Sequence, residues 1–231
     1  MKNKIKKSIN NFFFFYNKKV YSNHKVSFSQ EGEDRILEHI FKGKKEGFYI
    51  DIGANNPTKF NNTYLFYLKG WRGINIEPNP DFIPFFKQLR PGDTNLNVGI
   101  SDKEEIIDYY VFDESCVNTF SKERKQYLTK ETNFKLINTI KIKCYPLCEI
   151  LNDNLSVNQD IDFMSIDTEG FDFKILKSNN WSKFLPKYIL VEDHHKPIKD
   201  IISSEISKYL EANGYSFYYR TYNTSFFKLL K

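Results

Sequence analysis

The chain has few of the residues that build disulfide frameworks, zinc sites or membrane spans. Its 231 residues include only three cysteines, with no Cys-x-x-Cys pair and no histidines at zinc-finger spacing. A structural zinc site or a disulfide framework is therefore not expected, and a reducing cytoplasm fits best. No apolar run approaches the roughly 20 residues that a membrane span needs. Arg-rich runs are also missing and the net charge is only +5, so nucleic-acid binding is not favoured.

The glycine-rich loops that hold phosphates are missing too. A dinucleotide-binding sheet would show Gly-x-Gly-x-x-Gly after its first strand, whereas Gly53 is followed by Ala54 and Asn55 with no second glycine. The P-loop pattern with Lys-Ser/Thr is also absent. An anionic pyrophosphate would in addition be repelled by Asp51. An NAD-dependent oxidoreductase is therefore only an alternative interpretation.

What the sequence does contain is a regular alternation of short apolar strands and helices. Strands that are apolar on both faces are typical of a parallel, doubly wound α/β sheet. The last two strands, 216–222 and 224–230, predict an antiparallel hairpin around Asn223. The other expected strands are 47–53, 72–78, 94–102, 104–113, 136–147, 162–170 and 187–195, and the expected helices are 30–41, 63–70, 79–89, 121–130, 171–178 and 201–214.

The simplest partition is a single domain over residues 26–231 preceded by a basic, aromatic extension over residues 1–25. Six lysines flank a short aromatic run in this extension, and its apolar residues recur at helical spacing. Such a helix can lie on an anionic membrane surface or pack on its own domain, and both alternatives stay open. The apolar run is too short for a secretory signal. The expected location is the cytoplasm, with peripheral contact to the inner membrane as an option.

Acidic residues follow most of the parallel strands. Because the carboxyl ends of these strands meet at one edge of the sheet, where such folds bind ligands, these acids are expected to surround the ligand. A cofactor with a positive centre and no phosphate, S-adenosylmethionine, fits this setting. Gly53 would allow close backbone approach, and Glu77, 24 residues later, would accept the ribose hydroxyls. Asp51 would meet the ammonium group and Asp102 the adenine amino group. The candidate cofactor-binding residues are Asp51, Gly53, Ala54, Asn55, Glu77, Pro78, Ser101 and Asp102.

Four stretches, SQEGEDRIL, GFYIDIGANNP, NNTYLFYLKGWRGINIEPNP and DFMSIDTEGFDFKIL, occur in this order between about Ser27 and His194. Together they resemble the FkbM-type S-adenosylmethionine-dependent methyltransferases. The resemblance implies a class I methyltransferase fold, with a seven-stranded sheet and a C-terminal antiparallel hairpin. It also implies methylation of an oxygen, often on a sugar or polyketide-like hydroxyl, and bacterial members often act on surface glycans. Related sequences often carry a histidine where this chain has Asn55 and Asn56.

The resemblance further suggests that the segment around Gln30 folds over the cofactor or acceptor site. Asn62 and Thr63, at the start of the helix after the first strand, could orient either ligand. The stretch from about Glu104 to Tyr145 is expected to shape the acceptor pocket. The candidate substrate-binding residues are Gln30, Glu33, Asp34, Asn62 and Thr63.

Methyl transfer to a hydroxyl calls for a base or a metal, because a sugar hydroxyl is a poor nucleophile. Asp167 ends the strand that faces the transferred methyl group in this fold class, so it is the first candidate, with His194 and Glu169 beside it. A magnesium ion on Asp167, Asp193 and His194 is an open alternative, since oxygen-rich clusters suit that ion. A cofactor-binding scaffold without catalysis, at a glycan-assembly site, is the alternative from a different functional class.

Overall fold

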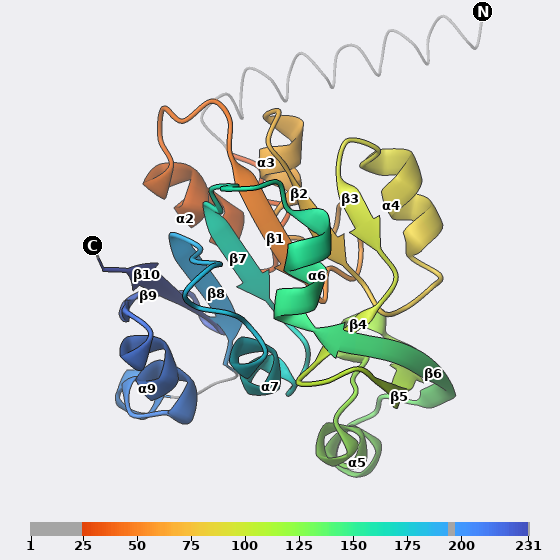
Figure 1. Ribbon diagram of the computed structural model, residues 1–231. Helices are drawn as coiled ribbons and strands as arrows, with labels where there is room; N and C mark the ends of the chain where they lie inside the picture. The colour runs from red at the N-terminus through yellow and green to blue at the C-terminus, as the bar shows by residue number, and fades with distance from the viewer. Residues whose placement is uncertain (1–24, 194–196, 231) are drawn as a thin grey trace, which may run out of the picture.

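The computed structural model describes residues 25–193 and 197–230 (Figure 1). Its centre is a seven-stranded sheet with the order β3-β2-β1-β7-β8-β10-β9. The first five strands in that order run parallel, and β10 pairs antiparallel with both β8 and β9. This confirms the doubly wound sheet and the terminal hairpin. The strands are β1 Phe48–Ile52, β2 Arg72–Ile76, β3 Thr94–Leu96, β7 Phe163–Ile166, β8 Tyr188–Glu192, β9 Tyr215–Arg220 and β10 Thr224–Leu229.

Helices cover both faces of this sheet, because the central strands bury side chains in both directions (Figure 1). In β1, Tyr49 belongs to one apolar cluster and Ile50 to the other. Residues of α2 and α3 pack with Tyr49, and residues of α6, α7 and α9 pack with Ile50. The helices are α2 Glu33–Ile40, α3 Tyr64–Leu68, α4 Ile83–Leu89, α5 Lys122–Glu131, α6 Leu147–Asn154, α7 Asp172–Lys177, α8 Ile198–Ile202 and α9 Glu205–Ala212, with a 3₁₀ turn η1 at Ser115–Val117.

The single strand expected over 94–102 is wrong, because the chain leaves the main sheet at Asn97. The Asn97 amide donates to the carbonyl oxygens of Glu77 and Pro78, both at 2.9 Å, and this turns the chain. The part beyond the turn, β4 (Gly99–Ser101), joins a second, three-stranded sheet with the order β4-β6-β5. In that sheet β6 (Leu136–Pro146) runs parallel to β4 and antiparallel to β5 (Glu105–Phe112).

Two expected helices also differ in their bounds. The helix expected over 30–41 begins only at Glu33, after Gly32 with a φ of 87°. The helix expected over 201–214 is two helices, α8 and α9. Ser204 separates them, because its hydroxyl accepts a hydrogen bond from the Ser207 N–H at 3.2 Å and so caps α9.

Residues 1–24 lie outside the described part of the chain, so the proposed extension stays a prediction from sequence. Within residues 25–193 and 197–230, each helix is too short and too polar to span a bilayer.

Candidate active site

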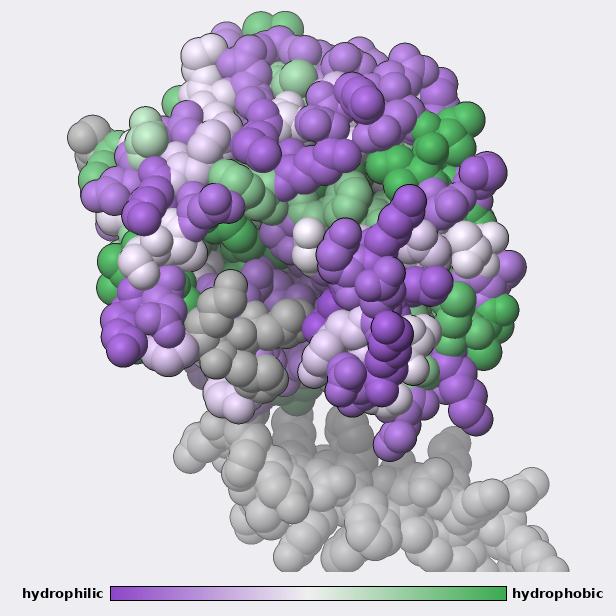
Figure 2. All heavy atoms as spheres, turned by 90° about the horizontal axis from the view of Figure 1, so that it is seen from below, coloured by the Kyte–Doolittle hydropathy of each residue, from purple (hydrophilic) through white to green (hydrophobic). Residues whose placement is uncertain are grey.

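A cavity of about 310 Å³ opens at the carboxyl ends of the parallel strands. Figure 2 looks onto this face from below and shows it hollowed near its middle. Ile52 of β1, Ile76 of β2 and Glu192 of β8 reach the cavity, as do the residues that follow β1, β2 and β7. The candidate residues in its lining are Gln30, Gly53, Asn55, Glu77, Pro78, Asp167 and Glu169.

Gly53 forms the turn after β1 and must be a glycine for two reasons. Its φ is 78°, in the left-handed region, and an added Cβ would lie 1.9 Å from the backbone oxygen of Asp167. The Gly53 N–H donates to the Ile76 carbonyl at 3.0 Å. This turn therefore brings the ends of β1, β2 and β7 together, and it leaves open backbone at the cavity wall.

Glu77 is the central polar group on the β2 side of the cavity. One carboxylate oxygen accepts from the Asn55 N–H and the other from the Asn79 N–H, each at 2.7 Å. Burial raises the pKa of Glu77 to about 7, with these two hydrogen bonds acting in the opposite direction. Each oxygen keeps a second lone pair, so the carboxylate can still accept two ligand hydroxyls. This pair of acceptor oxygens fits the ribose hydroxyls of S-adenosylmethionine, the role predicted from sequence.

Asp51 lies behind the cavity wall, and its proposed role toward the ammonium group is corrected. Its carboxylate accepts from the Asn61 amide at 3.1 Å and from the Thr63 hydroxyl at 2.8 Å. Burial raises its pKa. Thr63 therefore supports Asp51, and Asn62 donates to the Ser165 hydroxyl at 3.0 Å. None of these side chains, nor Ala54, contributes to the cavity lining.

Ser101 and Asp102 are also outside the lining, because Ser101 ends β4 of the second sheet and Asp102 follows it. The Ser101 hydroxyl donates to Glu105 at 2.6 Å, and the half-exposed Asp102 forms an ion pair with Lys174 at 3.2 Å. The nearby residues that do line the cavity are Val98, Gly99 and Ile100. The structure therefore gives no support to a contact between Asp102 and adenine.

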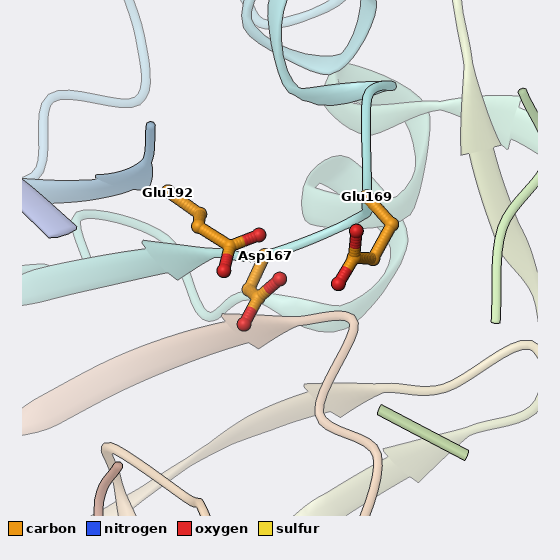
Figure 3. A group of neighbouring side chains, drawn as sticks. All are labelled: Asp167, Glu169 and Glu192. Carbon is orange, nitrogen blue, oxygen red and sulfur yellow. The ribbon is translucent and has the colours of Figure 1, made fainter. Parts of the chain in front are cut away.

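Three carboxyl groups, those of Asp167, Glu169 and Glu192, converge at the ends of β7 and β8 (Figure 3). One oxygen from each lies within 4.8 Å of the others. Asp167 is exposed to the cavity, Glu169 is buried and Glu192 lies between these extremes. Burial and the neighbouring charges of Asp167 and Glu169 strongly raise the pKa of Glu192, so it holds a proton at neutral pH.

Glu169 is fixed by groups that the sequence reasoning did not connect to it. The Arg124 guanidinium of α5 pairs with its carboxylate at 2.7 Å, and the Thr119 hydroxyl donates to its carbonyl at 2.8 Å. Its φ is 51°, an uncommon left-handed value for this residue type. Arg124 itself lines the cavity. The stretch 104–145 thus contributes to the cavity through β5, η1, α5 and the loops beside them, with the lining residues Tyr109, Ser115, Cys116, Val117, Asn118, Phe120, Arg124 and Phe134.

The proposed metal ligands Asp193 and His194 do not form this cluster in the described structure. Asp193 turns away, accepting a hydrogen bond from the Ser225 hydroxyl and pairing with Arg220 at 3.3 Å. His194 lies outside the described residues. Glu192, which was not among the candidate residues, takes their place. Its position as the last residue of β8 is the sequence signal that could have identified it.

The segment before α2 contributes one lining residue, and the first turn of α2 contributes two supporting ones. Gln30 lines the cavity, as expected of a substrate-binding candidate. Glu33 and Asp34 are buried outside the lining. Glu33 accepts from the Thr221 hydroxyl at 3.0 Å, and Asp34 accepts from the Phe28 N–H at 2.7 Å. Both acids therefore hold the segment in place and do not reach the cavity.

A family model described as the Methyltransferase FkbM domain matches residues 51–217. Among solved structures, the crystal structure of a TehB-like SAM-dependent methyltransferase from Corynebacterium glutamicum ATCC 13032 Kitasato is 9% identical with a TM-score of 0.41, over 96% of this chain and 100% of that one. No curated protein matches the sequence. The chain belongs to the FkbM family of S-adenosylmethionine-dependent methyltransferases.

Proposed function

We propose that this methyltransferase acts on a hydroxyl group of a sugar or surface-glycan precursor. S-adenosylmethionine supplies an electrophilic methyl group. The observation that carries the proposal is the placement of Asp167, Glu169 and Glu192 in the same cavity as Gly53 and Glu77. The cavity thus combines a cofactor seat with a cluster of hydrogen-bond acceptors, which suits an acceptor molecule rich in hydroxyl groups.

The acid cluster supports a division of roles between Asp167 and Glu192. Two carboxyl groups this close do not both ionise readily, and the more buried one retains the proton. Glu192 is the more buried of the two and its pKa is raised, whereas Asp167 is exposed to the cavity, so we assign the proton to Glu192 and the ionised form to Asp167. An ionised carboxylate can accept the acceptor hydroxyl's proton as the methyl group is transferred. Asp167 is therefore our general base.

A hard divalent ion such as magnesium remains an alternative way to balance this cluster. Its ligands would be Asp167, Glu169 and Glu192, in place of the set proposed from sequence. Dialysis against EDTA followed by magnesium addition separates the two mechanisms. Activity that survives EDTA supports the carboxylate base, and activity that only magnesium restores supports the metal.

The decisive experiment compares Asp167→Asn with Asp102→Asn. Methyl transfer from S-adenosylmethionine would be followed by mass spectrometry on a panel of methyl glycosides and nucleotide sugars. Asp167→Asn should lower kcat by about 100-fold or more, the usual contribution of a general base, and leave the affinity for S-adenosylhomocysteine unchanged. Asp102→Asn, outside the cavity, should behave as wild type. An unchanged kcat in Asp167→Asn would contradict the assignment of the base.

Two alternatives from the sequence make different predictions in the same experiment. A non-catalytic scaffold would bind S-adenosylhomocysteine and methylate no member of the panel. An NAD-dependent oxidoreductase would bind NAD instead. The turn after β1 argues against NAD, because Gly53 is followed by Ala54 and Asn55 and supplies no glycine-rich cradle for a pyrophosphate.

We also propose that residues 1–25 bring the enzyme to an anionic membrane surface. The support is their seven lysines and the helical spacing of their apolar residues. Precursors of surface glycans are commonly assembled at membranes, so such contact would place the enzyme near its acceptor.

A further inference from the structure

We propose that the mouth of the cavity contains a sugar-ring subsite, formed by the phenyl face of Phe60 and the amide oxygen of Asn223. The proposal rests on the function proposed above and specifies how the acceptor is held. Phe60 comes from the loop after β1, and Asn223 from the turn between β9 and β10. Both residues line the same cavity as the acid cluster.

Phe60 has an unusual combination of exposure and backbone strain. Phe60 is 48% exposed although it lines the cavity. Its φ is 51°, a conformation that is costly for a bulky residue. Exposed apolar area and a strained backbone both lower the stability of the free protein. Strained positions cluster at ligand clamps, where the gain comes with the ligand.

The chain on either side of Phe60 is held firmly. Before it, the Asn56 side chain accepts from the N–H groups of Thr58 and Lys59, both at 3.0 Å. After it, Asn61 is only 1% exposed, and its N–H donates to the Phe28 carbonyl at 3.0 Å. The ring is therefore presented by a fixed backbone, which lowers the entropy cost of stacking a ligand on it. The Lys59 ammonium lies over one face of the ring, 4.8 Å from its centre, so a ligand would stack on the opposite face.

Asn223 offers an unused hydrogen-bond acceptor. Its backbone N–H and its side-chain amide both donate to the carboxylate of Glu31, at 2.7 and 2.6 Å. This contact fixes the orientation of the amide, since the nitrogen must face the carboxylate. Its Oδ1 is buried and has no hydrogen-bond partner within residues 25–193 and 197–230. A buried acceptor without a partner is costly, and a hydroxyl of the ligand would satisfy it.

The segment 28–31 brings Phe60 and Asn223 to the same part of the cavity. At one end of the segment, the Phe28 carbonyl accepts a hydrogen bond from the N–H of Asn61, the residue after Phe60. At the other end, the Glu31 carboxylate accepts a hydrogen bond from the N–H of Asn223. Gln30, between these two anchors, is exposed and also lines the cavity. Glu77, which we propose binds the cofactor ribose, lies on the β2 side of the cavity. We therefore assign the side formed by Phe60 and Asn223 to the acceptor.

The chemistry of the subsite matches a pyranose. A sugar ring has a face of C–H bonds that carry partial positive charge, and these pack on the negative face of a phenyl ring. Its edge carries hydroxyls, which can donate to Asn223 Oδ1 and to the acid cluster. A flat aromatic acceptor would use Phe60 but would leave most of these acceptors without donors.

The test uses the full chain saturated with S-adenosylhomocysteine, and it needs no knowledge of the natural acceptor. Saturation-transfer NMR would measure binding of methyl β-D-glucopyranoside, methyl β-D-galactopyranoside and methyl α-D-mannopyranoside. Phe60→Ala keeps a Cβ, and hence the same backbone strain, so it removes the ring alone. Phe60→Trp keeps an aromatic face. Phe85→Ala is the matched control, because Phe85 is 53% exposed on α4 and outside the cavity.

We expect at least one pyranoside to bind, with the strongest transfer to the C–H protons of one ring face. Phe60→Ala should weaken that binding roughly two- to tenfold, whereas Phe60→Trp and Phe85→Ala should retain it. Affinity for S-adenosylhomocysteine should be the same in all four proteins. Failure of every pyranoside to bind, or equal binding by Phe60→Ala, would overturn the subsite and leave methyl transfer standing. Failure of wild type to bind S-adenosylhomocysteine would overturn the proposed function itself.

Discussion

Glu77 is the residue whose protonation should be visible in cofactor binding. Its pKa in the free protein is raised to about 7 by burial, and only the ionised form accepts hydroxyls at both oxygens. Ribose binding therefore favours ionisation. Affinity for S-adenosylhomocysteine should rise as the pH increases through 7, by about tenfold between about pH 6 and 8.

Calorimetric titration across this range tests the pH dependence. Glu77→Gln removes the titrating group, so its affinity should be lower at pH 8 and nearly independent of pH. A wild-type affinity that does not vary with pH would show that Glu77 does not bind the ribose as an ionised carboxylate.

Comparing Gly53 with Gly70 separates the loss of stability caused by a positive φ from the loss caused by a steric clash. Gly53→Ala introduces both a strained φ and a clash with the Asp167 backbone oxygen. Gly70→Ala is the control, because Gly70 has a φ of 96° and an added Cβ there meets nothing within 4 Å. Urea denaturation should show a loss of about 1–2 kcal/mol for Gly70→Ala and a larger loss for Gly53→Ala.

The two glycine variants should also differ in function. Gly53→Ala should lose S-adenosylhomocysteine binding, since the clash displaces the turn that meets the cofactor. Gly70→Ala should bind normally. Equal stability losses in the two variants would indicate that the chain relaxes around the Gly53 clash.

Single residues were predictable from sequence where a strand end decides their position. Gly53, Glu77 and Asp167 directly follow apolar strands, so their placement needs only the strand bounds. Asp51 lies within β1, on the face shared with Tyr49, because side chains two apart in a strand point the same way. Applying that alternation to Asp51 would have directed it away from the ligand.

At the scale of elements, residues 27–34 form a strap at the edge of the cavity. The Asp34 carboxylate accepts from the Ser27 hydroxyl at 2.6 Å, the Phe28 N–H at 2.7 Å and the Ser29 hydroxyl at 3.0 Å. Asp34→Ala should destabilise the protein by about 2–4 kcal/mol, because three donors, of which Ser29 is buried, lose their acceptor. Urea denaturation measures this loss, and Asp81→Ala, at an exposed position, should cost less than about 0.5 kcal/mol.

Loss of the Asp34 hydrogen bonds should also loosen the strap locally. Hydrogen exchange over residues 27–34 should speed up in Asp34→Ala more than exchange in the central strands. Protection that stays unchanged there would mean that the contacts of Glu31 and Glu33 alone hold the strap.

Whether a segment forms a helix or a strand was largely predictable from sequence, whereas the sheet that each strand joins was not. Apolar periodicity gave the strands of the main sheet and the terminal hairpin. It could not reveal that residues 94–96 and 99–101 join different sheets, because that depends on the hydrogen bonds of the Asn97 side chain. The cavity wall was the least predictable part, since its lining residues Phe60, Arg124 and Asn223 come from three distant segments that meet only in the folded chain.

At the scale of the whole molecule, a buried network of hydrogen bonds connects the Gly53 turn after β1 to the core. Arg90 is fully buried, and its guanidinium donates to Asp93 at 2.9 Å, Tyr49 at 2.8 Å and Asn61 at 3.1 Å. Asn61 in turn holds Asp51 behind the Gly53 turn. Arg90→Met should destabilise the protein by about 3–5 kcal/mol in urea denaturation, because it leaves Asp93 buried without its cation.

The control for Arg90→Met is Arg72→Met, which removes an exposed guanidinium and should have a much smaller effect. An equally small loss in Arg90→Met would show that the network rearranges around the apolar side chain.

The positive surface charge of the molecule should let it bind an anionic membrane. Residue 25 adjoins a basic surface, where Lys25, Arg35, Lys42 and Lys69 line one hollow with Glu38 as its single acid. The lysines of residues 1–24 extend this positive charge along the sequence. The full chain should therefore bind vesicles containing phosphatidylglycerol, and a chain beginning at residue 25 should bind at least about tenfold more weakly, since each lysine near the surface contributes about 1 kcal/mol.

Co-sedimentation with vesicles measures this difference, with pure phosphatidylcholine vesicles as the lipid control. Binding of the full chain should fall as salt is raised, because charge supplies the attraction. The shortened chain should keep its affinity for S-adenosylhomocysteine, since the cavity lining described here begins at Gln30. Equal vesicle binding by the two chains would assign the attraction to the basic surface of the folded domain. A loss of cofactor affinity on shortening would instead favour a first segment that packs on its own domain.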